Sequence, residues 1–118
     1  MNASRISPLF MPPFDAEVFL HNAGVGRRLV ELRAKQVFFT QGEPSECVFY
    51  LTKGRVRLSV ISHRGKEATI ALMNSNEFLG EESIIGVNAL RQATATAITP
   101  CSALRIDRAE LIRVIHEE

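Results

Sequence analysis

The sequence predicts a mainly β fold, a double-stranded β-helix or jelly roll with short flanking helices. Several short segments alternate apolar and polar residues, which is the side-chain period of a strand with one buried face. Turn residues such as glycine, proline and asparagine separate these segments about every 10 residues. Helical signals occur only near the two ends of the chain, so helices are expected to flank the sheets.

The size and composition of the chain fit a single globular domain. It has 118 residues, of which 46% are hydrophobic and 23% charged, enough apolar material for one core. Its net charge is only +1, whereas a domain that grips nucleic acid by itself usually has a strong basic excess. We expect residues 1–14, which hold three of the five prolines, to be a flexible N-terminal arm and residues 15–118 to be the folded domain.

The first elements follow from caps and apolar runs. Asp15 is placed to cap a short helix over 16–22. Residues 26–32 fit helical spacing as well as a strand, and we favour the strand because the sequence that follows is β. Further strands are predicted over 35–40 and 47–51, the second being a continuous apolar run typical of a buried strand.

A hairpin and a C-terminal helix complete the pattern. Residues 56–62 alternate as a half-buried strand does, residues 63–66 form a hairpin loop, and Ala68, Ile70 and Leu72 mark the apolar side of the returning strand. The last strands are predicted over 92–98 and 102–106. Asp107-x-x-Glu110 is a capping-box signal that opens the final helix.

The segment from Phe78 to Ala97 carries the chemistry. Gly80 allows the backbone to approach a ligand without an intervening Cβ, and the residues after it begin a short helical turn whose free N–H groups attract anions. Glu81 lies in that turn, where its carboxylate is able to accept hydrogen bonds from hydroxyl groups. Ser83 is expected to hydrogen-bond within the turn, because no Ser–His–acid arrangement indicates a nucleophile.

Arg91 follows Glu81 by ten residues and shares one face of a regular strand with Ala93, Ala95 and Ala97. Small alanines leave room inside a barrel, and an arginine aimed into that interior needs a counter-charge such as a phosphate. The alternative is that Arg91 lies at the wet end of the strand in an ordinary salt bridge with a nearby glutamate, and that the alanines face a bulky aromatic residue.

The order of these residues resembles a known family. Gln41-Gly42-Glu43, Phe49-Tyr50-Leu51 and Lys53-Gly54 come first, followed by Gly65-Lys66-Glu67, Phe78-Leu79-Gly80-Glu81 and Arg91-x-Ala93-Thr94-Ala95. This ordered set is similar to the cyclic-nucleotide-binding domain of the catabolite activator and fumarate–nitrate regulator (CRP/FNR) family of bacterial transcription regulators. The resemblance covers roughly residues 27–118.

The resemblance implies a ligand-sensing role and a set of binding residues. Gly80 and the N–H groups after it would line a phosphate–ribose site, Glu81 would accept from the ribose 2′-hydroxyl, and Arg91 would pair with the cyclic phosphate of cyclic AMP or cyclic GMP. The whole set expected at this pocket is Gly80, Glu81, Glu82, Ser83, Arg91, Gln92 and Ala93.

Two positions depart from the family pattern and keep a second hypothesis open. Gln92 stands where nucleotide binders usually have serine or threonine, and Glu82 stands where the family is usually apolar. A degenerate domain that binds no ligand and acts through dimerisation or protein contacts is therefore the alternative to a cyclic-nucleotide sensor.

The resemblance also implies partners and a compartment. We expect a homodimer in the full-length regulator, with DNA contacted only through a C-terminal dimerisation helix and DNA-binding domain that these residues do not contain. No apolar run reaches the ~18 residues of a membrane span, and no signal peptide is evident, so a cytoplasmic protein without membrane contact is expected.

Enzyme and metal chemistry are not indicated. His21, His63 and His116 are scattered rather than clustered, so neither a metal site nor a cupin-like enzyme is expected. Cys47 and Cys101 lie in apolar stretches and are expected to be small buried hydrophobes. The remaining arginines at 27, 28, 105, 108 and 113 have acids among them and are expected to lie on solvated faces.

Overall fold

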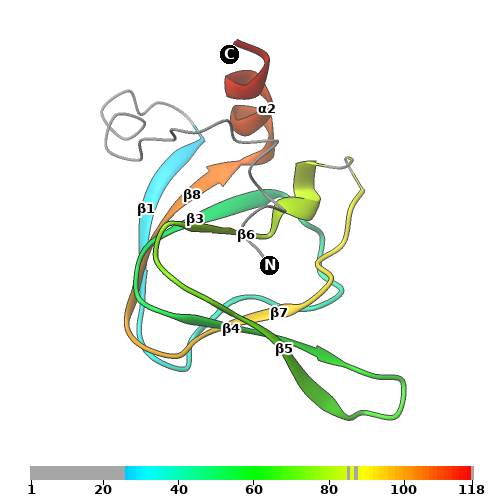
Figure 1. The fold of residues 1–118 in the computed structure, drawn as a ribbon. Coiled ribbons are helices and arrows are strands. Elements are labelled where there is room, and N and C mark those ends of the chain that lie inside the picture. Colours follow the sequence, from blue (N-terminus) through cyan, green and yellow to red (C-terminus); the bar gives the residue numbers. More distant parts are fainter. Residues whose placement is uncertain (1–25, 85, 87, 118) are drawn as a thin grey trace.

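Two antiparallel four-stranded sheets form the body of the protein in the computed structural model, which describes residues 26–84, 86 and 88–117. The first sheet has the strand order β1-β8-β3-β6 and the second has β2-β7-β4-β5, and Figure 1 shows the two sheets facing each other. The first four strands are β1 (Arg27–Leu32), β2 (Val37–Phe39), β3 (Cys47–Lys53) and β4 (Val56–Ile61). The others are β5 (Glu67–Met73), β6 (Glu77–Leu79), β7 (Thr94–Ala97) and β8 (Cys101–Asp107).

A 3₁₀ helix, η2 (Glu81–Ile84), and a C-terminal helix, α2 (Arg108–Glu117), complete the described elements. The mainly β class predicted from the sequence is confirmed, and each strand expected from residue 26 onward is present with small shifts at its ends. The expected arm over 1–14 and helix over 16–22 lie outside the described residues.

Strand β6 is absent from the sequence-based expectation. It has three residues, too few for an alternating pattern to be visible, and it follows directly on the turn after β5. Its register is set by its neighbour, because Tyr50 at the centre of β3 pairs with Phe78 and their rings lie 4.9 Å apart. Strand β6 matters for function because it delivers the chain to Gly80.

The core lies between the two sheets. Cys47, Phe49 and Leu51 on one face of β3 belong to a buried cluster that includes Val56 of β4 and Ala95 of β7. The intervening residues of β3 point to the opposite face and are also buried, where α2 and η2 contact the strand. Burial on both faces explains why β3 is a continuous apolar run.

The β4–β5 hairpin extends away from the body (Figure 1), and the expectation for its buried side is wrong. Ile70 and Leu72 are 56% and 49% exposed and Ala68 is exposed as well, whereas Met73 is buried at 2%. The pairing of the hairpin shifts register after Leu58. Residues 67–70 are exposed on both faces of the strand, because this part of the hairpin extends away from the body, and the sequence pattern alone does not reveal how far a strand continues past the core.

Helix α2 is tied to β1 by charged side chains. Glu110 pairs with both Arg27 and Arg113, and the side chains of Arg27 and Glu110 are only 6% and 9% exposed. The hydrogen bond from Arg113, followed by the pairing with Arg27, holds the pKa of Glu110 below its ordinary value. The expectation that Arg27 lies on a solvated face is therefore wrong.

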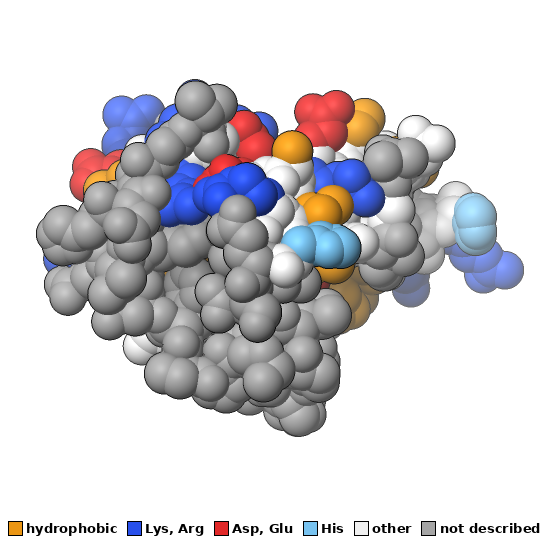
Figure 2. All heavy atoms as spheres, turned by 90° about the horizontal axis from the view of Figure 1, so that it is seen from above, with side chains coloured by type: hydrophobic (Ala, Val, Ile, Leu, Met, Phe, Trp, Pro, Cys, Tyr) orange, Lys and Arg blue, Asp and Glu red, His pale blue; other side chains and the backbone are white. Residues whose placement is uncertain are grey.

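On the face that carries α2, the described basic side chains have acidic ones among them (Figure 2). None of the helices in the described part of the chain is long and apolar enough to cross a membrane.

Candidate functional site

The site is organised by the turn that links β6 to η2. Gly80 adopts a φ of +80°, a conformation that residues with a side chain rarely adopt, and the chain then enters η2. Ser83 is fully buried, and both its amide and its hydroxyl donate to the carbonyl of Gly80 at 3.4 Å. The expected role of Ser83 inside the turn is thus confirmed, and Glu81 lies half-buried in the same turn.

Arg91 is held across from this turn by its backbone. Its amide donates to the carbonyl of Glu43 at 2.7 Å, and its carbonyl accepts from the amide of Gly42 at 2.8 Å. From Arg91 to Ala97 the residues are alternately buried and not buried, although the strand itself begins only at Thr94. The predicted period of two is confirmed here, with Gln92 exposed on the outer side.

The guanidinium of Arg91 points into the molecule. The residue is only 4% exposed, so the alternative that it lies at the wet end of the strand is wrong. One terminal nitrogen, Nη2, donates to the carbonyl of Cys47 at 2.9 Å and contacts its Sγ at 3.3 Å, while Nη1 donates to the carbonyl of Gly80 at 3.3 Å. The ring of Phe39 covers the guanidinium at 4.1 Å.

One polar atom of this side chain is left over. Nε of Arg91 is buried and has no hydrogen-bond partner among the described residues. Buried donors of charged groups almost always have an acceptor, because leaving one unmet is costly. The arginine therefore has capacity for one further acceptor.

The carboxylate of Glu82 makes the nearest defined carboxylate contact with Arg91. Its Oε1 lies 3.9 Å from Nη1 of Arg91, and its Oε2 accepts from the backbone N–H of Gln92 at 3.0 Å. The side chain of Glu82 is only 13% exposed. The salt bridge with a neighbouring glutamate, considered as an alternative from sequence, is thus present, but around a buried arginine.

The absence of a side chain at residue 80 is a condition of this geometry. A Cβ added to Gly80 would lie 2.1 Å from Nη1 of Arg91 and 3.3 Å from the ring of Phe39. Arg91 can reach the Gly80 carbonyl only because that position is a glycine.

A hollow of about 530 Å³ opens beside the guanidinium, between the edges of β1 and β2, a size within the range of ligand pockets. Its walls include Arg91, Phe39, Cys47, Phe49 and Arg105. A hydrogen bond with the Cys47 side chain is the main cause that raises the pKa of Arg105 above its ordinary value. Cys47 therefore lines the hollow together with two arginines, Arg91 and Arg105.

The alanines do not line this hollow. Ala93, Ala95 and Ala97 are buried, and the latter two belong to the hydrophobic core cluster with Phe39 and Phe49. The expectation that small side chains keep space open is therefore not met at these positions. The alternative, in which the alanines accompany bulky aromatic residues, describes the core better.

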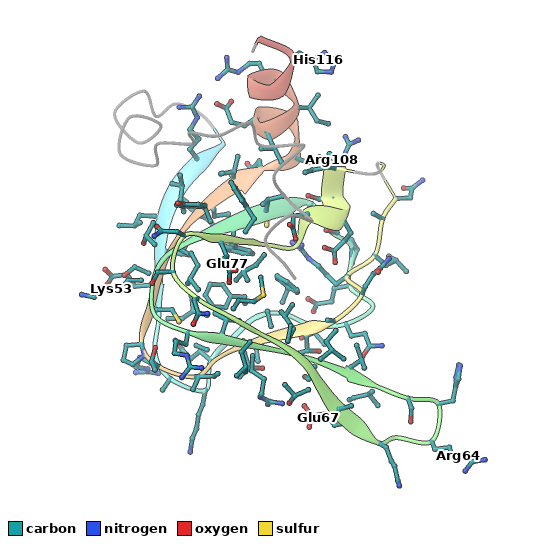
Figure 3. The ribbon with its side chains drawn as sticks, viewed as in Figure 1. Lys53, Arg64, Glu67, Glu77, Arg108 and His116 are labelled. Carbon is teal, nitrogen blue, oxygen red and sulfur yellow. The ribbon has the colours of Figure 1, made fainter. Side chains whose placement is uncertain are left out.

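A contact that the sequence did not indicate joins the turn to the C-terminal helix. Nε of Arg108, the first residue of α2, donates to the carbonyl of Ser83 at 2.7 Å. Figure 3 shows Arg108 at the base of α2 beside η2. Its amide also donates to the carbonyl of Glu46 at 2.9 Å, so the expectation of a solvated Arg108 is wrong.

The described residues contain no group of three His, Cys, Asp or Glu side chains arranged as metal ligands would be. His63 and His116 are exposed, and His21 lies outside the described residues. Cys47 and Cys101 are free and buried, as expected, and burial raises the pKa of Cys101.

The chain is similar to known proteins in sequence and in fold. Residues 29–118 match the family model of the cyclic nucleotide-binding domain. The global nitrogen regulator of Synechocystis sp. is 40% identical over 73 residues, which cover 61% of this chain and 32% of that protein. The cAMP-activated global transcriptional regulator CRP of Salmonella typhimurium is 30% identical over 73 residues, covering 62% of this chain and 35% of that protein.

Among solved structures, the catabolite activator protein of Thermus thermophilus aligns with a TM-score of 0.77 and 27% identity, over 94% of this chain and 51% of that one. The matched region thus spans about a third of the length of the two curated relatives and about half of the Thermus thermophilus protein.

Proposed function

Because the chain belongs to the cyclic nucleotide-binding domain family, as its sequence motifs implied, we propose that it is the effector-sensing domain of a CRP/FNR-type bacterial transcription regulator. Its effector in this proposal is a cyclic nucleotide, cyclic AMP or cyclic GMP. The role is regulatory rather than enzymatic.

The buried guanidinium of Arg91 carries this proposal. It is 4% exposed, its nearest defined carboxylate contact is 3.9 Å long, and its Nε has no acceptor among the described residues. A structural arginine of this kind is usually matched by a close bidentate carboxylate. A phosphate oxygen would provide the missing acceptor together with a negative charge closer than that of Glu82.

Each proposed ligand contact uses a group whose position is already described. The cyclic phosphate would lie between Arg91 and the turn over 80–83, with the backbone N–H of Gln92 as a further donor. Glu81 would accept from the ribose 2′-hydroxyl, and Ala93 would contribute a small apolar contact. Gln92 serves through its backbone here, since its side chain is exposed.

The magnitudes allow binding in the micromolar range. Each charge-assisted hydrogen bond contributes about 1.5–3 kcal/mol, and micromolar affinity requires about 8 kcal/mol in total. One new bond to Nε of Arg91, smaller gains where the phosphate replaces acceptors that are already present, the ribose contact at Glu81 and burial of the nucleoside together reach that sum.

Helix α2 is the element that would report binding. Arg108 links α2 to the Ser83 carbonyl at 2.7 Å, so a ligand that moves the turn also shifts the preferred position of the helix. In the full-length protein this movement would be passed to a dimer partner and to a C-terminal DNA-binding domain. We place such a regulator in the cytoplasm.

The second candidate is a domain that binds no nucleotide and acts through dimerisation or protein contacts. The contacts of Glu82 favour it, because this carboxylate already engages Arg91 and the amide of Gln92. The two candidates differ in one measurable property, which is heat released on adding a cyclic nucleotide.

Isothermal titration calorimetry with cyclic AMP and cyclic GMP tests the proposal. The protein is titrated alongside Arg91→Met, which keeps an apolar stem against Phe39, and Arg57→Met, a control at a partly exposed arginine of the β4–β5 hairpin. We expect binding by the parent and the control and an affinity at least about tenfold lower for Arg91→Met.

Thermal melting of both variants verifies that they are folded. No heat with either nucleotide at millimolar concentration contradicts the proposal and favours the ligand-free domain. Equal affinity of the parent and Arg91→Met contradicts the assigned role of Arg91.

A further inference from the structure

We propose that Glu82 acts as a resident counter-anion that competes with the effector's phosphate for the same two donors. This inference rests on the proposed function and concerns the regulation of the same site. In this inference Glu82 sets the effector affinity, because the ligand has to displace a carboxylate of the protein itself before it binds.

The contacts of the carboxylate define the competition. Its Oε2 accepts from the backbone N–H of Gln92 at 3.0 Å, and its Oε1 lies 3.9 Å from Nη1 of Arg91. These are two of the donors that the proposed function assigns to the phosphate. Carboxylate and phosphate present the same chemistry to a guanidinium, namely two anionic oxygens held by a planar fork of N–H groups.

Burial makes this arrangement more than a surface ion pair. The side chains of Arg91 and Glu82 are 3% and 13% exposed, so each charge is largely removed from water and depends on the other. By contrast, the carboxylate of the nearby Glu43 is exposed and accepts from the backbone N–H of Thr40. Glu82 is thus placed to stabilise the charge of Arg91.

The pairing is loose enough to be exchanged. A distance of 3.9 Å is longer than the 2.7–2.9 Å of a charge-assisted hydrogen bond, and Nε of Arg91 remains without an acceptor. The cyclic phosphate of the proposed effector carries two exocyclic oxygens, and one of them placed at Nε would give that donor the acceptor that Glu82 does not provide. The exchange is therefore favourable for an anion that reaches Nε as well as a donor that Glu82 now engages.

Competition predicts that neutralising Glu82 strengthens effector binding. Glu82→Gln keeps the side-chain length and an oxygen for the Gln92 amide but removes the charge that opposes an incoming anion. We expect cyclic AMP or cyclic GMP to bind about 10- to 100-fold more tightly, which is the equivalent of one charge-assisted hydrogen bond. Glu31→Gln is the matched control, because it makes the same charge change at an exposed residue of β1.

Calorimetry of the parent, Glu82→Gln and Glu31→Gln with both nucleotides gives distinct outcomes. Tighter binding by Glu82→Gln alone supports the competition, including the case in which only this variant binds measurably. Binding by the parent with unchanged or weaker binding by Glu82→Gln overturns the competition and leaves the proposed function standing. No binding by any of the three proteins overturns both.

A second measurement needs no nucleotide. Urea unfolding of Glu82→Gln, Arg91→Met and the double variant gives the coupling between the two side chains. We expect the double variant to be more stable than the sum of the single losses predicts, because each single change leaves a buried charge without its partner. Strictly additive losses mean that Glu82 does not hold Arg91, and they overturn the inference whatever the calorimetry shows.

Discussion

Replacing Gly80 with alanine is expected to dislodge Arg91, and the chain offers a close control for the backbone part of the effect. Gly80 has a φ of +80°, and an added Cβ would lie 2.1 Å from Nη1 of Arg91. Gly65 has a φ of +81°, but an added Cβ would meet no atom within 4 Å. The two substitutions therefore share the conformational strain and differ in the collision.

The magnitudes follow from these geometries. Placing alanine in a left-handed conformation costs about 1–2 kcal/mol, which is the whole expected loss for Gly65→Ala. In Gly80→Ala the guanidinium must also give up its hydrogen bond to the carbonyl of residue 80. Because the guanidinium is buried, water does not replace that acceptor. Losing one charge-assisted hydrogen bond adds about 1.5–3 kcal/mol, so we expect a total loss of about 2.5–5 kcal/mol.

Urea unfolding followed by circular dichroism measures both losses. In an Arg91→Ala background, the cost of Gly80→Ala should fall to that of Gly65→Ala, since the atom in its way is gone. Calorimetry should also show weaker cyclic-nucleotide binding by Gly80→Ala than by Gly65→Ala. Equal destabilisation by the two single substitutions would refute the reasoning, because it would mean that Arg91 yields its position at no cost.

Two further predictions concern helix α2. Arg108→Ala removes the hydrogen bond to the Ser83 carbonyl. It should leave nucleotide affinity nearly unchanged and abolish the effect of nucleotide on hydrogen exchange of the α2 amides. Arg113→Ala is the control, and an effect retained in Arg108→Ala would contradict the proposed link from the turn to α2. The pKa of Glu110 lies below its ordinary value of 4.5 in the folded protein, so the unfolded chain takes up the proton first as the pH falls. The stability from the ion pairs of Glu110 is complete above about pH 4.5 and is lost as the pH falls through the lower folded pKa. Glu110→Gln should therefore reduce the change of unfolding free energy with pH in that window. An unchanged pH dependence would show that Glu110 does not contribute.

The fold could be predicted because most of its signals are local. The alternation from Arg91 to Ala97 gave the correct buried face, since one face of β7 lies on the core along its length. The exposure of both faces of β5 over 67–70 was not predictable from the same rule, because it depends on how far the hairpin extends from the body. Strand β6 was missed for a similar reason, since three residues show no period and its partner β3 determines its register.

The turn at Gly80 and the inward side of Arg91 agree with an expectation from the sequence, whereas the contacts of these residues were not predictable. The spacing from Gly80 to Arg91 identified the turn and the inward arginine, because both depend on local backbone and on strand alternation. Besides the Gly80 carbonyl, the guanidinium contacts a carbonyl from β3 and a ring from β2, and no sequence pattern links those strands to residue 91. Glu82 was noticeable as an added charge near the expected phosphate, yet its hydrogen bond to the Gln92 amide follows only from the folded turn.

The contacts of Arg91 set how much affinity a ligand can gain from it. A phosphate that takes the donors now engaged with Gly80, Cys47 and Glu82 exchanges one set of hydrogen bonds for another, so each exchange contributes a difference of about 0.5–1.5 kcal/mol rather than the strength of a full bond. Only Nε offers a donor that starts without an acceptor among the described residues. Most of the affinity must therefore come from Nε, the ribose contact at Glu81 and burial of the base. A ligand that carries phosphate alone should bind far more weakly than a nucleotide, and this difference would distinguish an effector site from a general anion site.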